Sequence, residues 1–135
     1  MRNLSFALTT TQVRESYGLC ARGERPLKDV TRRRGTYWAE VLRPGDMLWA
    51  VEKSQGIKKG GLVRLGTIRV VSVRVENLWP LSQAECVREG FPEMTPEQFA
   101  TMFCRHMGGA ADQLVTRIEF AYVTRWFAIL PESSR

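Results

Sequence analysis

Residues 28–34 hold side chains whose types and spacing suit chemistry on a polar or anionic ligand. Arg32, Arg33 and Arg34 are consecutive, and guanidinium groups bind phosphate or carboxylate through charge-assisted hydrogen bonds. Lys28 can act as a base if its pKa is lowered, and Thr31 can act as a nucleophile beside such a base. The residues alone leave simpler roles open: the lysine can be solvated, the hydroxyl can bind backbone locally, and the arginines can clamp phosphate.

The positive charge of the chain is concentrated in two segments. The net charge is +6 and the isoelectric point is near 9.7, which favours anionic partners such as nucleic acid. Besides residues 28–34, a basic segment at residues 53–64 contains Lys58 and Lys59, which we include among the ligand-binding candidates. That segment lacks the Gly-x-x-x-x-Gly-Lys-Ser/Thr spacing of a triphosphate-binding loop.

Aromatic residues near the basic segment are candidates for stacking on a base. Tyr37 and Trp38 follow the arginines directly, and stacking on an aromatic ring contributes roughly 1–3 kcal/mol per base. Core packing is the alternative for both. For Trp49, the strand pattern around it favours core packing over ligand binding.

Metal or disulfide chemistry has little support in the composition. The three cysteines, Cys20, Cys86 and Cys104, are far apart and form no Cys-x-x-Cys pair. His106 is the single histidine, so with Cys104 it offers two metal ligands where a structural zinc site needs four. We therefore expect no metal and no cofactor, and no catalysis that depends on histidine.

The length of 135 residues fits one domain, residues 1–135, with a core at about 5–123 and a short C-terminal extension at 124–135. The sequence lacks an apolar run of the roughly 18 residues that span a membrane, and its first residues do not resemble a signal peptide. We expect a cytoplasmic protein with no membrane partner.

The N-terminal half predicts few regular elements. Residues 5–8 should be extended, and residues 12–17 should form a short helix that Gly18 ends. Residues 18–36 have no apolar period and predict an ordered loop. Pro44, Gly45 and Asp46 predict a turn into a strand at residues 47–52, with Met47, Trp49 and Val51 on one face.

The C-terminal half has stronger signals. Residues 66–76 predict a strand whose alternation slips by one residue, which a β-bulge near Val71 and Ser72 explains. Ser82 and Thr95 begin capping boxes of two helices, and residues 116–123 predict a final strand with Ile118, Phe120 and Tyr122 on one face. Together these elements predict an α+β domain with a small curved sheet or barrel flanked by short helices.

The order of these features resembles the ASCH family of the PUA-like superfamily. The resembling motifs span residues 5–123 and include a Lys-x-x-Thr-x-Arg signature, a Gly-Asp turn, a helix ending in Glu-Gly-Phe, a helix opened by Thr-Pro-Glu-Gln-Phe, and a final strand. Their residues are Lys28, Thr31 and Arg33; Gly45 and Asp46; Glu89, Gly90 and Phe91; residues 95–99; and residues 115–120. The resemblance implies a PUA-like β-barrel with a cleft for an RNA-associated ligand.

Within that family, the resemblance to small bacterial N4-acetylcytidine amidohydrolases implies a catalytic set of Lys28, Thr31 and Glu89. In this scheme the neighbouring arginines and partial burial lower the pKa of Lys28, Lys28 removes the Thr31 proton, and Thr31 attacks an amide carbonyl. Glu89 positions water or moves a proton in the second step, and either a backbone amide near the glycine turns or Arg33 faces the oxyanion. The chain departs from the small amidohydrolases at residues 53–64 and in its C-terminal extension.

Two other functions remain open at the level of sequence. One is a non-catalytic module that binds RNA or single-stranded nucleic acid through Arg32, Arg33 and Arg34, and the other is a ribonuclease. The expected partner is RNA or a modified nucleoside, and the sequence distinguishes neither RNA from DNA nor one oligomeric state from another.

Overall fold

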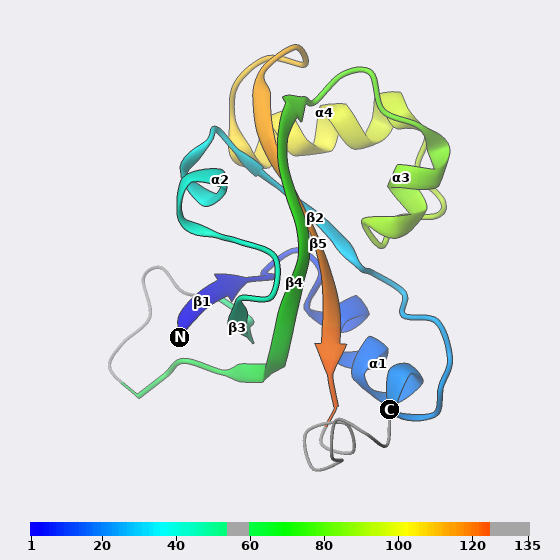
Figure 1. Cartoon of the computed structure of the whole chain (residues 1–135). Coiled ribbons are helices and arrows are strands. Elements are labelled where there is room, and N and C mark those ends of the chain that lie inside the picture. The colour runs from blue at the N-terminus through cyan, green and yellow to red at the C-terminus, as the bar shows by residue number, and fades with distance from the viewer. Residues whose placement is uncertain (54–59, 125–135) are drawn as a thin grey trace.

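In the part of the chain that the structure describes, five strands form one curled sheet, which Figure 1 shows as a half-barrel with β4 and β5 at its centre. The computed structural model describes residues 1–53 and 60–124. The strand order is β1-β3-β4-β5-β2; β1 and β3 are parallel, and the other pairs are antiparallel. The strands are β1 (Arg2–Ser5), β2 (Val30–Arg34), β3 (Met47–Val51), β4 (Arg64–Asn77) and β5 (Leu114–Val123).

Four helices accompany the sheet within the described residues. In Figure 1, α1 lies beside the lower half of β5, and α3 and α4 lie beside the upper halves of β4 and β5. The helices are α1 (Thr10–Ala21), α2 (Tyr37–Val41), α3 (Gln83–Arg88) and α4 (Pro96–Met107). The α+β class with a curved sheet and short helices is therefore confirmed. None of the helices among residues 1–53 and 60–124 is long and apolar enough to cross a bilayer.

The two faces of the sheet carry separate apolar cores. Alternation along β5 places Ile118, Phe120 and Tyr122 in one core, together with Phe6, as the pattern predicted. Val115 faces the other way and packs with α3 and α4 through residues such as Phe99 and Phe103. Each face of the sheet is therefore covered by its own apolar cluster.

The predicted bulge in β4 is confirmed. The register between β4 and β5 shifts between Val70 and Ser72, where Phe120 and then Glu119 are their partners. The extra residue lets Ile68 and Val70 face the core before the bulge and lets Val73 pack against it afterwards.

Both predicted helix starts are confirmed. The Ser82 side chain accepts a hydrogen bond from the Glu85 amide, so it caps α3, but the Glu85 carboxylate binds Arg32 and Arg117 and does not complete the predicted capping box. Thr95 and Gln98 form a reciprocal capping box at the start of α4, with Pro96 in the first turn.

The prediction of a loop over residues 18–36 was wrong. Helix α1 continues through Gly18 to Ala21, and β2 occupies residues 30–34. The strand has no apolar alternation because both of its faces are buried and both carry polar side chains, Thr31 on one face and Arg32 on the other.

The core packing expected for Trp49 was also wrong, although Val51, predicted to share its face, is buried. Leu48 and Ala50 belong to the core, while Trp49 is half-buried on the opposite face. There the Arg64 guanidinium lies 4.2 Å from the centroid of a Trp49 ring, which is a cation–π contact. The arginine side chain, and not the core, therefore packs on this indole.

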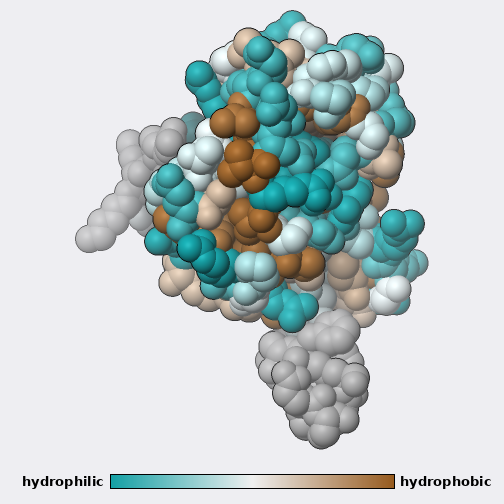
Figure 2. Space-filling view, turned by 45° about the horizontal axis from the view of Figure 1, so that its top comes forward, coloured by the Kyte–Doolittle hydropathy of each residue, from teal (hydrophilic) through white to brown (hydrophobic). Residues whose placement is uncertain are grey.

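The face of the molecule in Figure 2 is mainly hydrophilic. Its exposed apolar residues form a broken row between polar ones and do not merge into one broad area. That face therefore offers no extended apolar surface of the kind that marks a stable protein interface.

We predict that Thr95→Ala lowers the free energy of unfolding by about 1 kcal/mol, because the Gln98 amide loses its capping partner. Urea denaturation of the purified protein measures this. Thr101→Ala, on the exposed side of the same helix, is the matched control and should change stability by less than about 0.5 kcal/mol. Equal losses in the two variants would contradict a capping role.

Candidate functional site

Strand β2 forms one edge of the sheet and presents different side chains to its two faces. Its pairing with β5 matches Thr31 with Ile118, Arg32 with Arg117 and Arg33 with Thr116. Because residues paired across an antiparallel ladder share a face, Thr31 and Arg33 lie on the face of Ile118, and Arg32 lies on that of Arg117.

A buried carboxylate, Glu89, joins the end of α3 to this edge. The Lys28 ammonium donates to Glu89 Oε1 at 3.0 Å and to the Glu89 carbonyl at 2.7 Å. The Arg32 guanidinium donates to Glu89 Oε2 at 3.0 Å. All three side chains are at most 4% exposed, so these charges interact with one another and have little contact with water.

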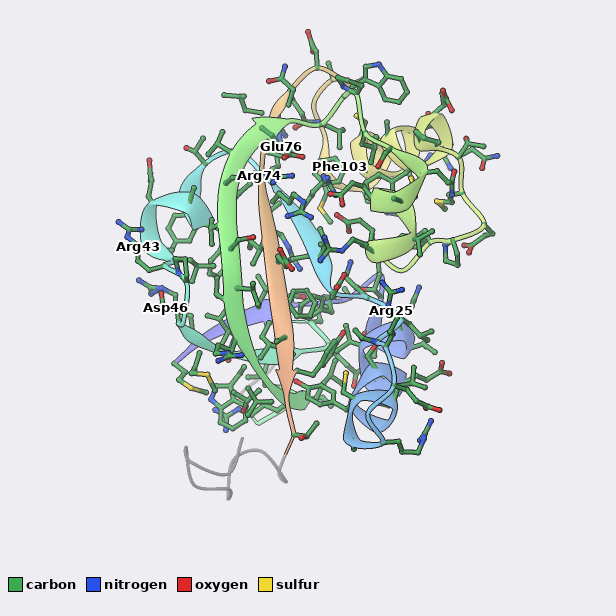
Figure 3. All side chains as sticks on the ribbon, turned by 45° about the vertical axis from the view of Figure 1, so that its right-hand side comes forward. Arg25, Arg43, Asp46, Arg74, Glu76 and Phe103 are labelled. Atoms are coloured by element: carbon green, nitrogen blue, oxygen red, sulfur yellow. The ribbon has the colours of Figure 1, made fainter. Side chains whose placement is uncertain are left out.

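A second carboxylate, Glu85, binds the two arginines on that face. Arg32 donates to Glu85 Oε1 at 2.5 Å, and Arg117 donates to both oxygens at 2.6 and 3.2 Å. Arg32 also reaches Glu76 of β4 at 3.1 Å. In Figure 3, Glu76 and Arg74 lie on β4 at the level of Phe103, beside a group of nitrogen- and oxygen-bearing side chains between the sheet and α3. Arg32 and Arg117 can lie close together because the Glu85 carboxylate bonds to both and offsets their repulsion.

A second set of ion pairs, outside this cluster, also joins α3 to the sheet. Arg88 donates to both carboxylate oxygens of Asp29 at 3.0 and 3.1 Å and to Glu119 at 3.0 Å. The Asp29 amide in turn donates to the Arg88 carbonyl at 3.0 Å. The residue next to Lys28 and the residue next to Glu89 are therefore bonded to each other, which fixes the distance between the two candidate groups.

The environment lowers the pKa values of three groups, two cations and one carboxylate. Burial lowers the pKa of Lys28, the nearby Glu89 opposes this, and Arg33 and Arg32 add to the lowering. Burial lowers the pKa of Arg33 to about 10, so it stays protonated at neutral pH. Burial tends to raise the pKa of Glu85, but hydrogen bonds and charge from Arg117 and Arg32 prevail and lower it to about 2.

A cleft opens along β2 between the two cores. Segment 5–9 and residues of α4 line its sides, and it contains about 100 Å³ of space for solvent. Its polar lining residues are Ser5, Thr9, Lys28, Thr31, Arg32, Arg33 and Glu89.

Thr31 and Arg33 form a separate pair in this cleft. The Thr31 hydroxyl oxygen accepts a hydrogen bond from the Arg33 guanidinium at 3.1 Å, and that guanidinium lies 5.3 Å from the centroid of the Phe6 ring. Among the described residues Arg33 has no carboxylate partner, in contrast to Arg32. Arg33 is thus the cation of the cleft most available to a ligand.

Comparison of the structure with solved structures finds similar folds. A crystal structure of an ASCH domain from Lactobacillus crispatus aligns with a TM-score of 0.56 and 15% sequence identity, over 90% of this chain and 78% of that chain. The chain has an ASCH-like fold. A DUF984 protein from Enterococcus faecalis aligns with a TM-score of 0.58 and 14% identity, over 90% of this chain and 79% of that one. No family model and no curated protein sequence matches the chain.

The ASCH-like fold brings together five of the residues that the sequence singled out. Lys28, Thr31, Arg32, Arg33 and Glu89 line the same cleft. The main cause of the lowered Lys28 pKa is burial, and the neighbouring arginines contribute less than the sequence argument assumed.

The remaining ligand-binding candidates do not line this cleft. Arg34 is exposed and donates to the Met107 carbonyl at 3.3 Å. Tyr37 is exposed on α2, and Trp38 packs against the core, which is the alternative role the sequence left open. Lys58 and Lys59 lie outside the described residues.

Sequence reasoning missed Glu85 and Arg117. In the sequence, Glu85 stands three residues after Ser82, as the last residue of a capping box does, and Arg117 alternates with the apolar residues of the final strand. In the structure the two form a bidentate pair beside Arg32. A local signal existed for Arg117, because alternation along β5 places it on the face covered by α3 and α4.

We predict that Glu85→Gln lowers the free energy of unfolding at pH 7 by on the order of 2 kcal/mol, because Arg32 and Arg117 lose a charged partner. A folded-state pKa of about 2 lies below the unfolded value near 4.5, so this stabilisation is present above pH 4.5 and declines as the pH falls towards 2. The stability gap between wild type and variant, measured by denaturation at several pH values, should narrow over that interval. Glu97→Gln, at an exposed position of α4, is the control. A difference in stability between wild type and Glu85→Gln that does not depend on pH would contradict the lowered pKa of Glu85.

Proposed function

We propose that this ASCH-like domain binds one nucleoside in the β2 cleft and hydrolyses an amide on its base, with N4-acylated cytidine as the substrate class. The observation that supports this most is the buried Lys28–Glu89 pair, which lines the same small cleft as the Thr31 hydroxyl. These groups supply a base, a carboxylate and a nucleophile without a metal ion.

The size of the cleft favours a single ring over a polynucleotide. An apolar cavity of about 150 Å³ holds one benzene molecule, so about 100 Å³ in an open cleft suits one planar group or a small acyl group. The aromatic residues Phe6, Phe91 and Phe103 in its lining offer surfaces to such a ring.

The hydrogen bonds of Lys28 to Glu89 can be kept when the ammonium loses one proton and becomes the neutral amine that acts as the base. Its nitrogen donates to the Glu89 carboxylate and to the Glu89 carbonyl, and a neutral amine has two hydrogens for these two acceptors and one lone pair left. That lone pair can take the proton of a hydroxyl. Burial, which lowers the pKa of Lys28, increases the fraction in this state.

Thr31 is the proposed nucleophile. Its oxygen accepts a hydrogen bond from Arg33, which leaves its own hydrogen free to be donated to a base. Lys28 takes this proton as Thr31 oxygen bonds to the acyl carbon, and the bond from that carbon to N4 then breaks as Lys28 returns the proton to the leaving amine. Water then hydrolyses the threonine ester with help from Glu89, and Arg33 stabilises the oxyanion in both steps.

The rival function, a module that clamps phosphates, has weaker support. Most of the arginines around α3 and β2 are already bonded to carboxylates: Arg32 to three of them, Arg88 to two and Arg117 to Glu85. A guanidinium engaged in this way has few donors left for phosphate. Ribonuclease activity is a further alternative that the same assays detect.

We predict that the purified protein releases acetate from N4-acetylcytidine, and that Thr31→Val reduces kcat/KM at least about a hundredfold, because valine keeps the shape and removes the nucleophile. Thr31→Ser retains a hydroxyl and should stay within about tenfold of wild type. Chromatography of the nucleoside products measures both. Equal activity of wild type and Thr31→Val would contradict the proposal, and tight RNA binding without hydrolysis would favour the rival module.

We predict that Lys28→Arg also loses activity by at least about a hundredfold, since arginine keeps a positive charge for Glu89 but cannot be deprotonated. In the wild type, kcat/KM should rise with pH through the lowered pKa of Lys28 and then level off, because the deprotonated amine is the active form. Circular dichroism checks that the variant is folded. An active, folded Lys28→Arg enzyme would exclude Lys28 as the base.

A further inference from the structure

The backbone of β2 bonds to β5 at alternate residues. The Phe120 amide donates to the Asp29 carbonyl at 3.0 Å, and the Gly35 amide donates to the Leu114 carbonyl at 3.0 Å. In an antiparallel ladder the bonded pairs recur at every second residue, so Thr31 and Arg33, paired with Ile118 and Thr116, are the bonded positions between them. The N–H and C=O groups of Val30, Arg32 and Arg34 therefore point away from β5, towards the open edge.

Of these outward-facing residues, Arg32 lines the cleft. It is 3% exposed, and among the described residues neither a backbone nor a side-chain group bonds to its N–H or its C=O. Buried backbone groups without a partner are rare because leaving them unbonded costs free energy. The peptide groups of Arg32 thus offer an adjacent donor and acceptor inside the cleft.

The two cores flank this edge from opposite sides. Phe6 packs on Phe120, which is on the Thr31 face of the sheet, at a ring distance of 5.5 Å. Phe91 and Phe103 belong to the core on the other face. A flat ring that continues the plane of the sheet beyond β2 would lie between these aromatic groups, with its edge towards Arg32.

We infer that the backbone N–H and C=O of Arg32 recognise the edge of a planar base that carries an acceptor next to a donor, as N3 and the N4 hydrogen of cytidine do. This inference rests on the proposed function and adds to it the feature that selects the base. The pairing resembles the addition of one more strand residue to an open sheet edge. It also places an N4 acyl group next to Thr31 and Arg33, the two residues that flank Arg32 in the chain.

The test is nuclear magnetic resonance of ¹⁵N-labelled Thr31→Val protein, which should bind N4-acetylcytidine without turning it over. At saturation the Arg32 amide proton should move downfield and its exchange with solvent should slow at least about tenfold. The Arg34 amide has the same orientation on the strand but lies outside the cleft lining, so it should change little and serves as the internal control. Cytidine should bind at least about tenfold more tightly than 3-deazacytidine, which has the same shape but lacks the N3 acceptor.

The outcomes separate the inference from the function on which it rests. Binding that shifts the signals of Phe6 and Phe103 without affecting the Arg32 amide would overturn the inference and leave the proposed function standing. Equal affinity for cytidine and 3-deazacytidine would do the same. Absence of any nucleoside binding would overturn both.

Discussion

Glu89 is a carboxylate withdrawn from water, and the arrangement of the site depends on its two cationic partners. Lys28 and Arg32 each approach one of its oxygens at 3.0 Å. Burying any one of these charges alone would cost several kcal/mol, so the three are stable inside the protein only together. Because Glu89 directly follows α3 and the cations belong to the β2 segment, this contact fixes the helix against the edge of the sheet.

The remaining charges extend from that contact. Once α3 is held at β2, Glu85 lies between Arg32 and Arg117, and Arg88 reaches Asp29. The side of the sheet that could have been an ordinary apolar core is instead divided, with an ionic part near β2 and an aromatic part under α4. The cleft lies where these two parts meet the core on the opposite face, which explains why charged and aromatic groups line the same small space.

The sequence predicted elements best where the signal is local. A slip in alternation located the bulge at Val71, and two short motifs located the caps at Ser82 and Thr95, because each depends on neighbouring residues. It failed at β2, which is buried through ion pairs with residues more than fifty positions away. The core position expected for Trp49 was wrong for a related reason, because the Arg64 side chain of β4 packs on the Trp49 ring outside the core.

For the site, a resemblance to known proteins supplied what pattern analysis could not. Lys28, Thr31 and Arg33 are close in the chain, but nothing local connects them with Glu89. The structure joins Lys28 and Glu89 by hydrogen bonds and leaves Thr31 bonded to Arg33. The carboxylate that organises the arginines, Glu85, could not be found from spacing, because a residue in the first turn of a helix looks the same whether it caps the helix or binds another strand.

The most direct test of this account is a crystal structure of the Thr31→Val variant with N4-acetylcytidine. The account predicts electron density for the base in the β2 cleft, with its edge at the Arg32 backbone, its acyl carbon beside residue 31, and the Lys28–Glu89 contact retained. A nucleoside bound elsewhere on the protein, or a cleft that stays closed around Lys28 and Glu89 at saturating ligand, would contradict it.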